Sequence, residues 1–290
     1  MLALAIAALG LSAAHAAPSA DAPWIVFSGQ PDGTSVPQLF RVQTTGAGLE
    51  QITTGSLPAT DPAFSPSGAQ LVFSRLSSGI FRVNLDGTGL HRLTSGGRDS
   101  YPVWSPDGKR IAFVRPYRTE WRAYVMSASG SGQKLLKLAP PSGRPTWTRD
   151  GKSLFIPAAG GLVKVDSRTG GVQKVYRVVL DPSISQAATV TAGGQTVAFV
   201  GRRAPTGPPD CGESNCPAYA LYVSALSGKN RRRVANDTGP AGWSPDGKTL
   251  VYVSRGSLTL SPVAGGKTTA IPTGTHVASG DAPPAWQPRP

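Results

Sequence analysis

The sequence predicts an all-β fold, a six-bladed β-propeller of four-stranded antiparallel blades, and three observations predict it. The 290-residue chain contains 35 glycines and 27 prolines, which interrupt long helices and favour short elements joined by tight turns. A unit with a tryptophan and a hairpin recurs about every 40–45 residues, a period typical of one propeller blade. The two ends of the chain carry complementary halves of this unit.

The first residues indicate an exported protein. An apolar stretch precedes Ala14-His15-Ala16, which has the small-x-small pattern of a signal-peptide cleavage site. We therefore expect residues 1–16 to be a signal peptide, 17–23 a short linker and 24–290 the propeller. An uncleaved anchor is the alternative, because the leader contains no Lys or Arg. No later segment has about 18 consecutive apolar residues, so we expect no membrane span in the mature chain.

The repeated unit accounts for most of the chain. Its copies are "FSPSGAQLVFS" from Phe64, "WSPDGKRIAFV" from Trp104, "WTRDGKSLFIP" from Trp147, the decayed "VTAGGQTVAFV" from Val190, and "WSPDGKTLVYV" from Trp243. The steps between them are 40, 43, 43 and 53 residues. Each unit predicts a short inner strand, a turn, an alternating second strand, a third strand and a polar outer strand.

The Ser-Pro-Asp-Gly turn offers a hydroxyl, a carboxylate and an amine at Ser105, Asp107 and Lys109, which could be catalytic. The turn has a simpler explanation, because Pro presets the first turn position, Asp bonds nearby backbone N–H groups and Gly supplies positive φ. Gly persists in every copy, whereas Ser67 and Gly193 replace Asp in two of them. We interpret the carboxylates as turn residues and expect the tryptophans to fill the space between blades. The structural repeat residues are then Trp104, Asp107, Gly108, Trp147, Gly151, Trp243, Asp246, Gly247 and Trp286.

The chain ends predict the blade count. Pro284-Ala285-Trp286 matches the inner strand of the unit, and nothing after it supplies a second strand. Trp24–Gly29 matches that second strand. We therefore expect the N-terminal strands to pair with the C-terminal strand, which closes the ring and removes its exposed sheet edges.

The repeated Pro-x-Trp-Ser-Pro-Asp-Gly-Lys, followed by Ile-Ala-Phe, resembles the PD40 (WD40-like) repeat of TolB-like six-bladed propellers from Trp24 to Pro290. The resemblance implies a periplasmic or cell-surface protein that binds partners, with a peptidoglycan-associated lipoprotein as one such partner. The TolB family has an α/β domain before its propeller. Here about seven residues separate the expected cleavage site from Trp24, so we expect the propeller without that domain.

Cys211 and Cys216 bracket four small or polar residues. In an exported chain this spacing predicts a local disulfide. A metal pair is the alternative, but it needs further ligands, and beyond the leader the chain has only His91 and His276 as histidines. We expect no metal site and no cofactor.

Propeller geometry sorts the connections into two faces. The turn face carries the Ser-Pro-Asp-Gly turns and the turns between third and outer strands, and the loop face carries the remaining connections. We expect binding on the loop face, because irregular insertions such as "RPYRTEWR" at 115–122 lie there and function concentrates in such loops. In the alternative interpretation that segment is a solvated hairpin tip, with Trp121 folded against a neighbouring blade. The candidate binding residues are Arg98, Tyr117, Arg118, Trp121, Arg122, Arg144, Arg202, Arg203 and His276.

The net charge of +13 favours anionic partners. We expect the nine lysines on the turn face or the outer two strands, where lysine also blocks aggregation between sheet edges. Binding to an anionic cell-wall polymer or lipid headgroup therefore stays open. Nucleic acid is not an expected partner, since the chain has an export signal and no stacking platform for single strands.

Together these features predict an exported, non-enzymatic module that binds a protein or the cell envelope, monomeric and either periplasmic or secreted to the cell surface. The alternative is a carbohydrate-active lyase or hydrolase built on a propeller. Metal-dependent chemistry needs several converging His and carboxylate ligands, and the sequence has no G-x-S-x-G nucleophile motif. A lyase that uses Lys or Arg as its base stays open.

Overall fold

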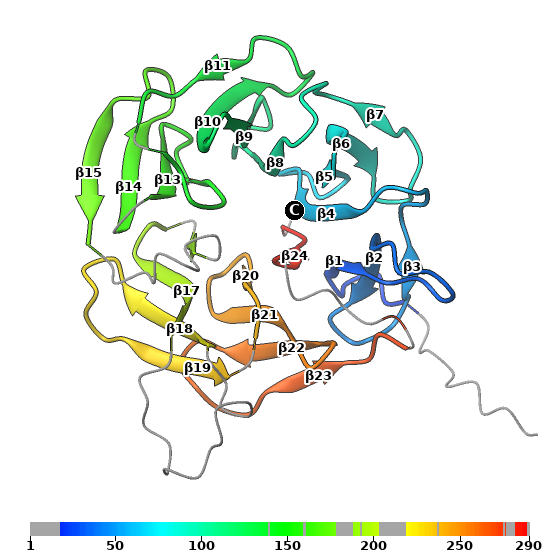
Figure 1. The fold of residues 1–290 in the computed structure, drawn as a ribbon. Coiled ribbons are helices and arrows are strands. Elements are labelled where there is room, and N and C mark those ends of the chain that lie inside the picture. The colour runs from blue at the N-terminus through cyan, green and yellow to red at the C-terminus, as the bar shows by residue number, and fades with distance from the viewer. Residues whose placement is uncertain are drawn as a thin grey trace, which may run out of the picture.

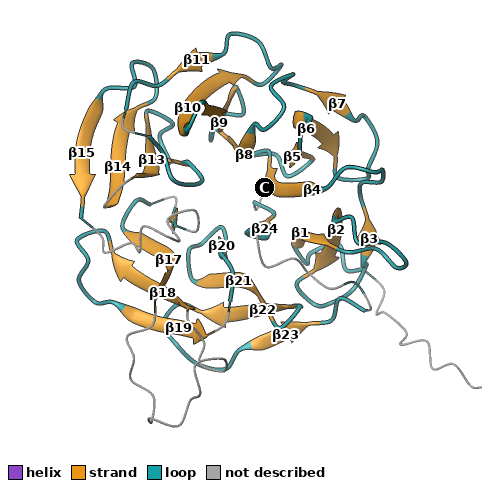
Figure 2. Ribbon diagram, in the orientation of Figure 1, coloured by secondary structure: helices purple, strands orange, loops and turns teal. Residues whose placement is uncertain are grey.

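The computed structural model describes residues 18–138, 140–158, 161–177, 188–191, 193–202, 219–236, 238–274, 276 and 282–288. These residues form 24 strands and no helix. The strands make six four-stranded antiparallel sheets arranged radially about a central axis (Figure 1, Figure 2). The predicted six-bladed propeller is confirmed. The described residues contain no helix long and apolar enough to cross a bilayer, and the expected signal peptide lies outside them.

Each blade contributes one strand to each of four layers, counted outward from the axis, and blades 1 to 6 are given in that order. The innermost strands are β24 (Ala285–Trp286), β4 (Ala59–Phe64), β8 (Ser100–Trp104), β12 (Thr146–Trp147), β16 (Thr189–Val190) and β20 (Gly242–Trp243). The second strands are β1 (Trp24–Gly29), β5 (Gln70–Arg75), β9 (Arg110–Tyr117), β13 (Ser153–Ala158), β17 (Thr196–Arg202) and β21 (Thr249–Ser254). The third strands are β2 (Gln38–Gln43), β6 (Gly79–Asn84), β10 (Glu120–Ser127), β14 (Gly161–Asp166), β18 (Tyr219–Ala225) and β22 (Ser257–Pro262). The outermost strands are β3 (Glu50–Gln51), β7 (His91–Arg92), β11 (Lys134–Leu135), β15 (Val172–Tyr176), β19 (Arg232–Asn236) and β23 (Thr269–Ile271).

The ring closes in blade 1, where β24 from the end of the chain pairs with β1 from its beginning (Figure 1). Ile25 lies opposite Trp286 in this antiparallel pair. The Gln287 backbone N–H donates to the Trp24 carbonyl at 2.8 Å, and the Trp24 N–H donates to the Gln287 side chain at 3.1 Å. The closure predicted from the two ends of the sequence is thus confirmed, and it pairs the inner edge of β1, which would otherwise be free.

The core lies between blades, because each sheet is covered on both faces. Strand β9 shows how alternation serves this arrangement, since successive side chains of a strand point to opposite faces. Ile111 and Phe113 pack in a cluster with residues of blade 2, while Ala112 and Val114 pack in a cluster with residues of blade 4. All four are at most 1% exposed. The second strands are therefore apolar on both faces, and each large side chain buried there contributes about 1.5–3 kcal/mol.

Gly242 marks the closest approach between neighbouring inner strands. A Cβ at this position would lie 2.1 Å from the Pro284 carbonyl oxygen, which belongs to the segment just before β24. The five equivalent positions before the inner-strand aromatic residue or Val190 hold side chains, namely Ala63, Val103, Thr146, Thr189 and Ala285. Glycine is therefore required only where blade 6 meets the blade that closes the ring.

We expect Gly242→Ala to lower the free energy of unfolding by about 1–3 kcal/mol, because the added methyl forces the backbones of blades 6 and 1 apart. Gly193→Ala is the matched control, since a Cβ there would meet no atom within 4 Å. Denaturant unfolding of the two variants measures the difference. Equal stabilities would contradict a close approach at the ring closure.

Candidate functional site

The carboxylates of the Pro-Asp-Gly turns are occupied by their own turns. Asp107 accepts hydrogen bonds from the Ser105 hydroxyl at 2.5 Å and from the Lys109 backbone N–H at 3.0 Å. Asp150 accepts the same two kinds of bond, from the Thr148 hydroxyl at 2.6 Å and the Lys152 N–H at 3.0 Å. The hydrogen bond from the hydroxyl is the main reason why the pKa of each of these two carboxyl groups is lowered. These groups are ionised and hydrogen-bonded, which suits a turn better than acid–base chemistry.

The segment "RPYRTEWR" forms the end of a long hairpin between β9 and β10. The guanidinium of Arg122 lies 3.8 Å from the Tyr117 ring centroid, and that of Arg118 lies 5.6 Å from it. Trp121 is partly buried against the core cluster between blades 3 and 4. The structure thus brings four candidate residues together at one tip, where the two guanidinium groups lie near the Tyr117 ring and Trp121 packs against the core.

The other candidates lie in separate places. Arg98 is exposed in the connection between blades 2 and 3, and Arg144 is buried in the connection before β12. The His276 ring stacks on Phe40 at 4.5 Å between centroids, and its Nδ1 lies 3.8 Å from an Asp32 carboxylate oxygen. The Arg202 side chain, Arg203, Cys211 and Cys216 lie outside the described residues, so the expected disulfide does as well.

A cavity of about 440 Å³ occupies the central channel. The inner strands of all six blades line it, and it reaches the turn face beside Pro66 and Pro106. Five inner-strand aromatic residues line it together with Val190 of blade 5: Phe64, Trp104, Trp147, Trp243 and Trp286. Its proline lining consists of Pro66, Pro106, Pro145, Pro283, Pro284 and Pro288. The channel therefore presents an aromatic and proline surface, a composition typical of protein-recognition sites.

The tryptophans of this ring also pack between blades. Trp147 belongs to the core cluster of blades 3 and 4, and its indole N–H donates to the Val103 carbonyl at 3.2 Å. Trp243 repeats the arrangement between blades 5 and 6, with its indole N–H donated to the Thr189 carbonyl at 3.2 Å. The same side chains thus hold neighbouring blades together and form the channel wall.

Arg144 is the one charged side chain among the described residues that line this channel. Its guanidinium donates to the Pro62 carbonyl at 2.8 Å, and its charge acts on the buried carboxyl of Asp61 in blade 2. Burial raises the pKa of Asp61, and the charge of Arg144 opposes that rise. Burial also disfavours the charged form of the Arg144 guanidinium, and it therefore lowers the pKa of Arg144. Buried groups of opposite charge from blades 2 and 4 thus interact beside the channel, and Arg144 is the one that lines it.

The sequence analysis missed Asp61 and Tyr101, which occupy the same place in blades 2 and 3 as Arg144 does in blade 4, directly before the Pro of Pro-x-Trp or Pro-x-Phe. Asp61 has φ of 56° and Tyr101 has φ of 57°, and each lies at a register shift of its inner strand. Left-handed backbone at non-glycine residues is costly and concentrates at functional sites. Comparing this one position between repeats would have found these residues.

Comparison with known proteins finds similarity to one family of propellers. Residues 12–150 match the family model PD40, described as the TolB beta propeller domain. Over these residues the chain is similar to the TolB propeller family, and its fold is that of a TolB-like β-propeller. TolB from Acinetobacter baumannii superposes on this propeller with a TM-score of 0.69 and 19% sequence identity, covering 92% of this chain and 67% of that one. A chain of the nidogen–laminin complex superposes with a TM-score of 0.65 at 12% identity, covering 91% of this chain and 98% of that one.

Three curated relatives resemble parts of this TolB-like propeller. The uncharacterized peptidase YuxL of Bacillus subtilis is 25% identical over 214 residues, which are 69% of this chain and 30% of the relative. The uncharacterized protein Atu1656 of Agrobacterium fabrum is 33% identical over 117 residues, 35% of this chain and 39% of the relative. Dipeptidyl-peptidase 5 of Porphyromonas endodontalis is 32% identical over 109 residues, 33% of this chain and 16% of the relative. The chain thus spans less than half the length of each curated relative.

Proposed function

We propose that this TolB-like propeller is an exported, non-enzymatic binding module that holds an extended apolar segment of an envelope or extracellular protein in the turn-face mouth of its central channel. The observation that carries the proposal is the channel wall of aromatic and proline side chains. Large rigid aromatic surfaces supply most of the binding energy at protein interfaces. Proline side chains add apolar contact and carry no backbone N–H that a ligand would have to satisfy.

The polar groups of the channel support a protein segment over a sugar. The Ser105 hydroxyl already donates to Asp107, and the Thr189 hydroxyl donates to the Ala241 carbonyl at 3.1 Å. The described lining contains no Asp, Glu or His, whereas a glycoside hydrolase needs a pair of carboxylates flanking its bond. The surface thus offers apolar contact and few free hydrogen-bonding groups, which favours apolar side chains of a peptide.

A charge placed at the channel rim tests this proposal. Pro106 is exposed and lines the channel, while Pro245 occupies the same turn position in blade 6 and is not part of the described lining. Peptides that bind the immobilised wild-type protein are first selected from a random library. We expect the selected peptides to share apolar or aromatic residues, and one of them then serves as the ligand. We expect Pro106→Glu to weaken a selected peptide about tenfold or more in calorimetric titration, because a carboxylate then faces apolar surface.

Pro245→Glu is the matched control and should change that affinity less than twofold. The two variants alter the same turn and the same net charge, so a general effect on the fold or on electrostatics would weaken both. Equal affinities for the two variants would place the peptide elsewhere and overturn the proposed channel site.

A second candidate function rests on the names of two curated relatives, which are peptidases. In that case the chain would itself hydrolyse peptides, and the purified protein would cleave a dipeptidyl anilide. Such hydrolysis, unaffected by Pro106→Glu and Pro245→Glu alike, would favour this candidate over the binding module.

A further inference from the structure

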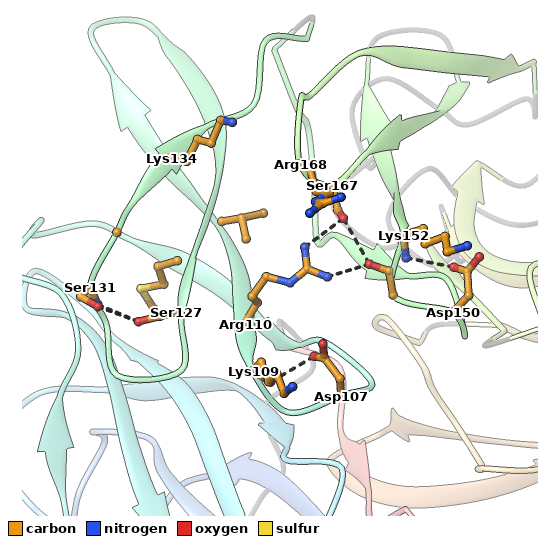
Figure 3. A pocket seen from close by; sticks show the side chains of 14 residues that line it. Asp107, Lys109, Arg110, Ser127, Ser131, Lys134, Asp150, Lys152, Ser167 and Arg168 are labelled. Carbon is orange, nitrogen blue, oxygen red and sulfur yellow. Dashed lines mark hydrogen bonds between the residues drawn. The ribbon is translucent and has the colours of Figure 1, made fainter.

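A second cavity, outside the channel, lies on the turn face between blades 3 and 4. It is an open cleft of about 710 Å³, room for roughly twenty waters at their liquid volume. Turns of two kinds from two blades form it (Figure 3). The Asp-Gly turns between the inner and second strands supply Lys109 and Lys152, the β14–β15 turn supplies Arg168, and the edge of β11 supplies Lys134.

The cleft is strongly cationic. Five Lys and Arg side chains line it against two carboxylates, a net charge of +3. Both carboxylates are the turn residues Asp107 and Asp150, which accept hydrogen bonds from their own turns. Asp166, just behind Arg168, likewise accepts backbone N–H groups of its turn. The acidic groups nearby therefore neutralise only part of the positive charge.

One cation is fixed and the other four are available. Arg110 lies across the interface, donating to the Ser167 hydroxyl at 3.1 Å and the Gly151 carbonyl at 2.8 Å, with its guanidinium 4.7 Å from the Trp147 ring centroid. In the described part of the chain, four exposed cationic side chains of the cleft make no hydrogen bond or ion pair: those of Lys109, Lys134, Lys152 and Arg168. Figure 3 shows side chains from both blades gathered around this one opening.

The propeller scaffold does not need these cations. The residue after the turn glycine is Ala69 in blade 2 and Gln195 in blade 5, where blades 3, 4 and 6 have Lys109, Lys152 and Lys248. In the turn between third and outer strands, blade 2 has Asp86 where blade 3 has Ser129. Ser129 is one of three serines whose hydroxyls lie within 3.1 Å of each other at the cleft edge, and two of these line it. The cations of this cleft are thus not a fixed part of the repeated unit.

We propose that this cleft binds a flexible polymer of phosphate groups. Lysine ammonium groups are point charges that suit phosphate oxygens, and the serine hydroxyls can donate to the same oxygens. The cations are spread over several turns of two blades. This arrangement suits a ligand with several phosphates in succession better than it suits a single phosphate group. Because the cleft is recessed between blades, a flexible chain reaches its cations more readily than the headgroups of a flat bilayer do.

The test uses long-chain inorganic polyphosphate as the probe, in calorimetric titration of the whole protein. We expect Lys109→Gln/Lys152→Gln to weaken binding about tenfold or more, since each charge-assisted hydrogen bond contributes on the order of a factor of ten. Lys229→Gln/Lys267→Gln is the matched control, because both lysines are exposed in turns between the third and outer strands of blades 5 and 6, outside the cleft. This control removes the same charge and should change the affinity less than twofold.

Each other outcome overturns the proposal. Equal weakening by the two double variants would mean diffuse attraction to the whole basic surface. Stronger binding to vesicles of phosphatidylglycerol and phosphatidylcholine than to polyphosphate would point to a membrane. Equal affinity for orthophosphate and polyphosphate would mean a single-anion site. Affinity for the selected channel peptide should stay unchanged in both double variants, so this test fails or succeeds separately from that of the channel.

Discussion

Replacing Arg144 by methionine is expected to lower the free energy of unfolding by about 3–5 kcal/mol, the cost typical of removing one partner from a buried charge pair. Arg144 is 8% exposed and Asp61 is 6% exposed. Without the guanidinium, the Asp61 carboxyl stays buried with no opposing charge, and the Pro62 carbonyl loses its 2.8 Å hydrogen bond. Denaturant unfolding measures the loss.

The exposed Arg98 provides the control, since Arg98→Met removes the same charge and should have a much smaller effect. The double variant Asp61→Asn/Arg144→Met should recover part of the stability, because no ionisable carboxyl is then buried alone. Equal stabilities of Arg144→Met and Arg98→Met would contradict a buried charge pair beside the channel.

The pH dependence of Arg144→Met has a definite sign. Burial already raises the pKa of Asp61 above 3.8, and loss of the opposing charge raises it further. A carboxyl with a raised folded-state pKa binds its proton more tightly in the folded protein. The stability of Arg144→Met should therefore fall, relative to the double variant, as the pH rises from about 3.8 through that raised pKa.

Trp147→Ala is expected to destabilise the propeller by about 3–5 kcal/mol, as for other large aromatic side chains removed from a core. Trp147 is 5% exposed and packs in the core cluster that joins blades 3 and 4. Its loss also removes the hydrogen bond to Val103 and the ring beneath the Arg110 guanidinium. Thermal and denaturant unfolding should both show the change.

Phenylalanine variants separate packing from hydrogen bonding. Trp147→Phe keeps most of the ring but loses the donor to the Val103 carbonyl. The Trp104 indole N–H has no hydrogen-bond partner among the described residues, so Trp104→Phe loses no such bond. We expect Trp147→Phe to cost about 0.5–1.5 kcal/mol more than Trp104→Phe. If Trp104→Phe were the more destabilising variant, the indole hydrogen bond would not contribute as described.

The sequence predicted the six blades and the closure of the ring because both depend on local patterns. The turn glycines adopt positive φ, for example 68° at Gly108, and a two-residue alternation sets the face to which each strand residue points. Trp24–Gly29 and the Trp286 segment were recognisable as halves of one unit for the same reason. Such features are determined by a few consecutive residues and do not depend on which blade lies next to which.

The tertiary structure alone decided where the candidate sites lie. The sequence analysis expected Arg144 with the other loop-face candidates, whereas the fold buries it beside Asp61, which is 83 residues earlier in the chain. It expected the nine lysines only on the turn face or the outer two strands, whereas the fold places Lys109 and Lys152 on one cleft. The sequence by itself determined the repeated blade and its turns. The channel and the cleft arise only when six blades pack around one axis, because side-chain contacts between blades depend on their spacing and tilt, which no single repeat encodes.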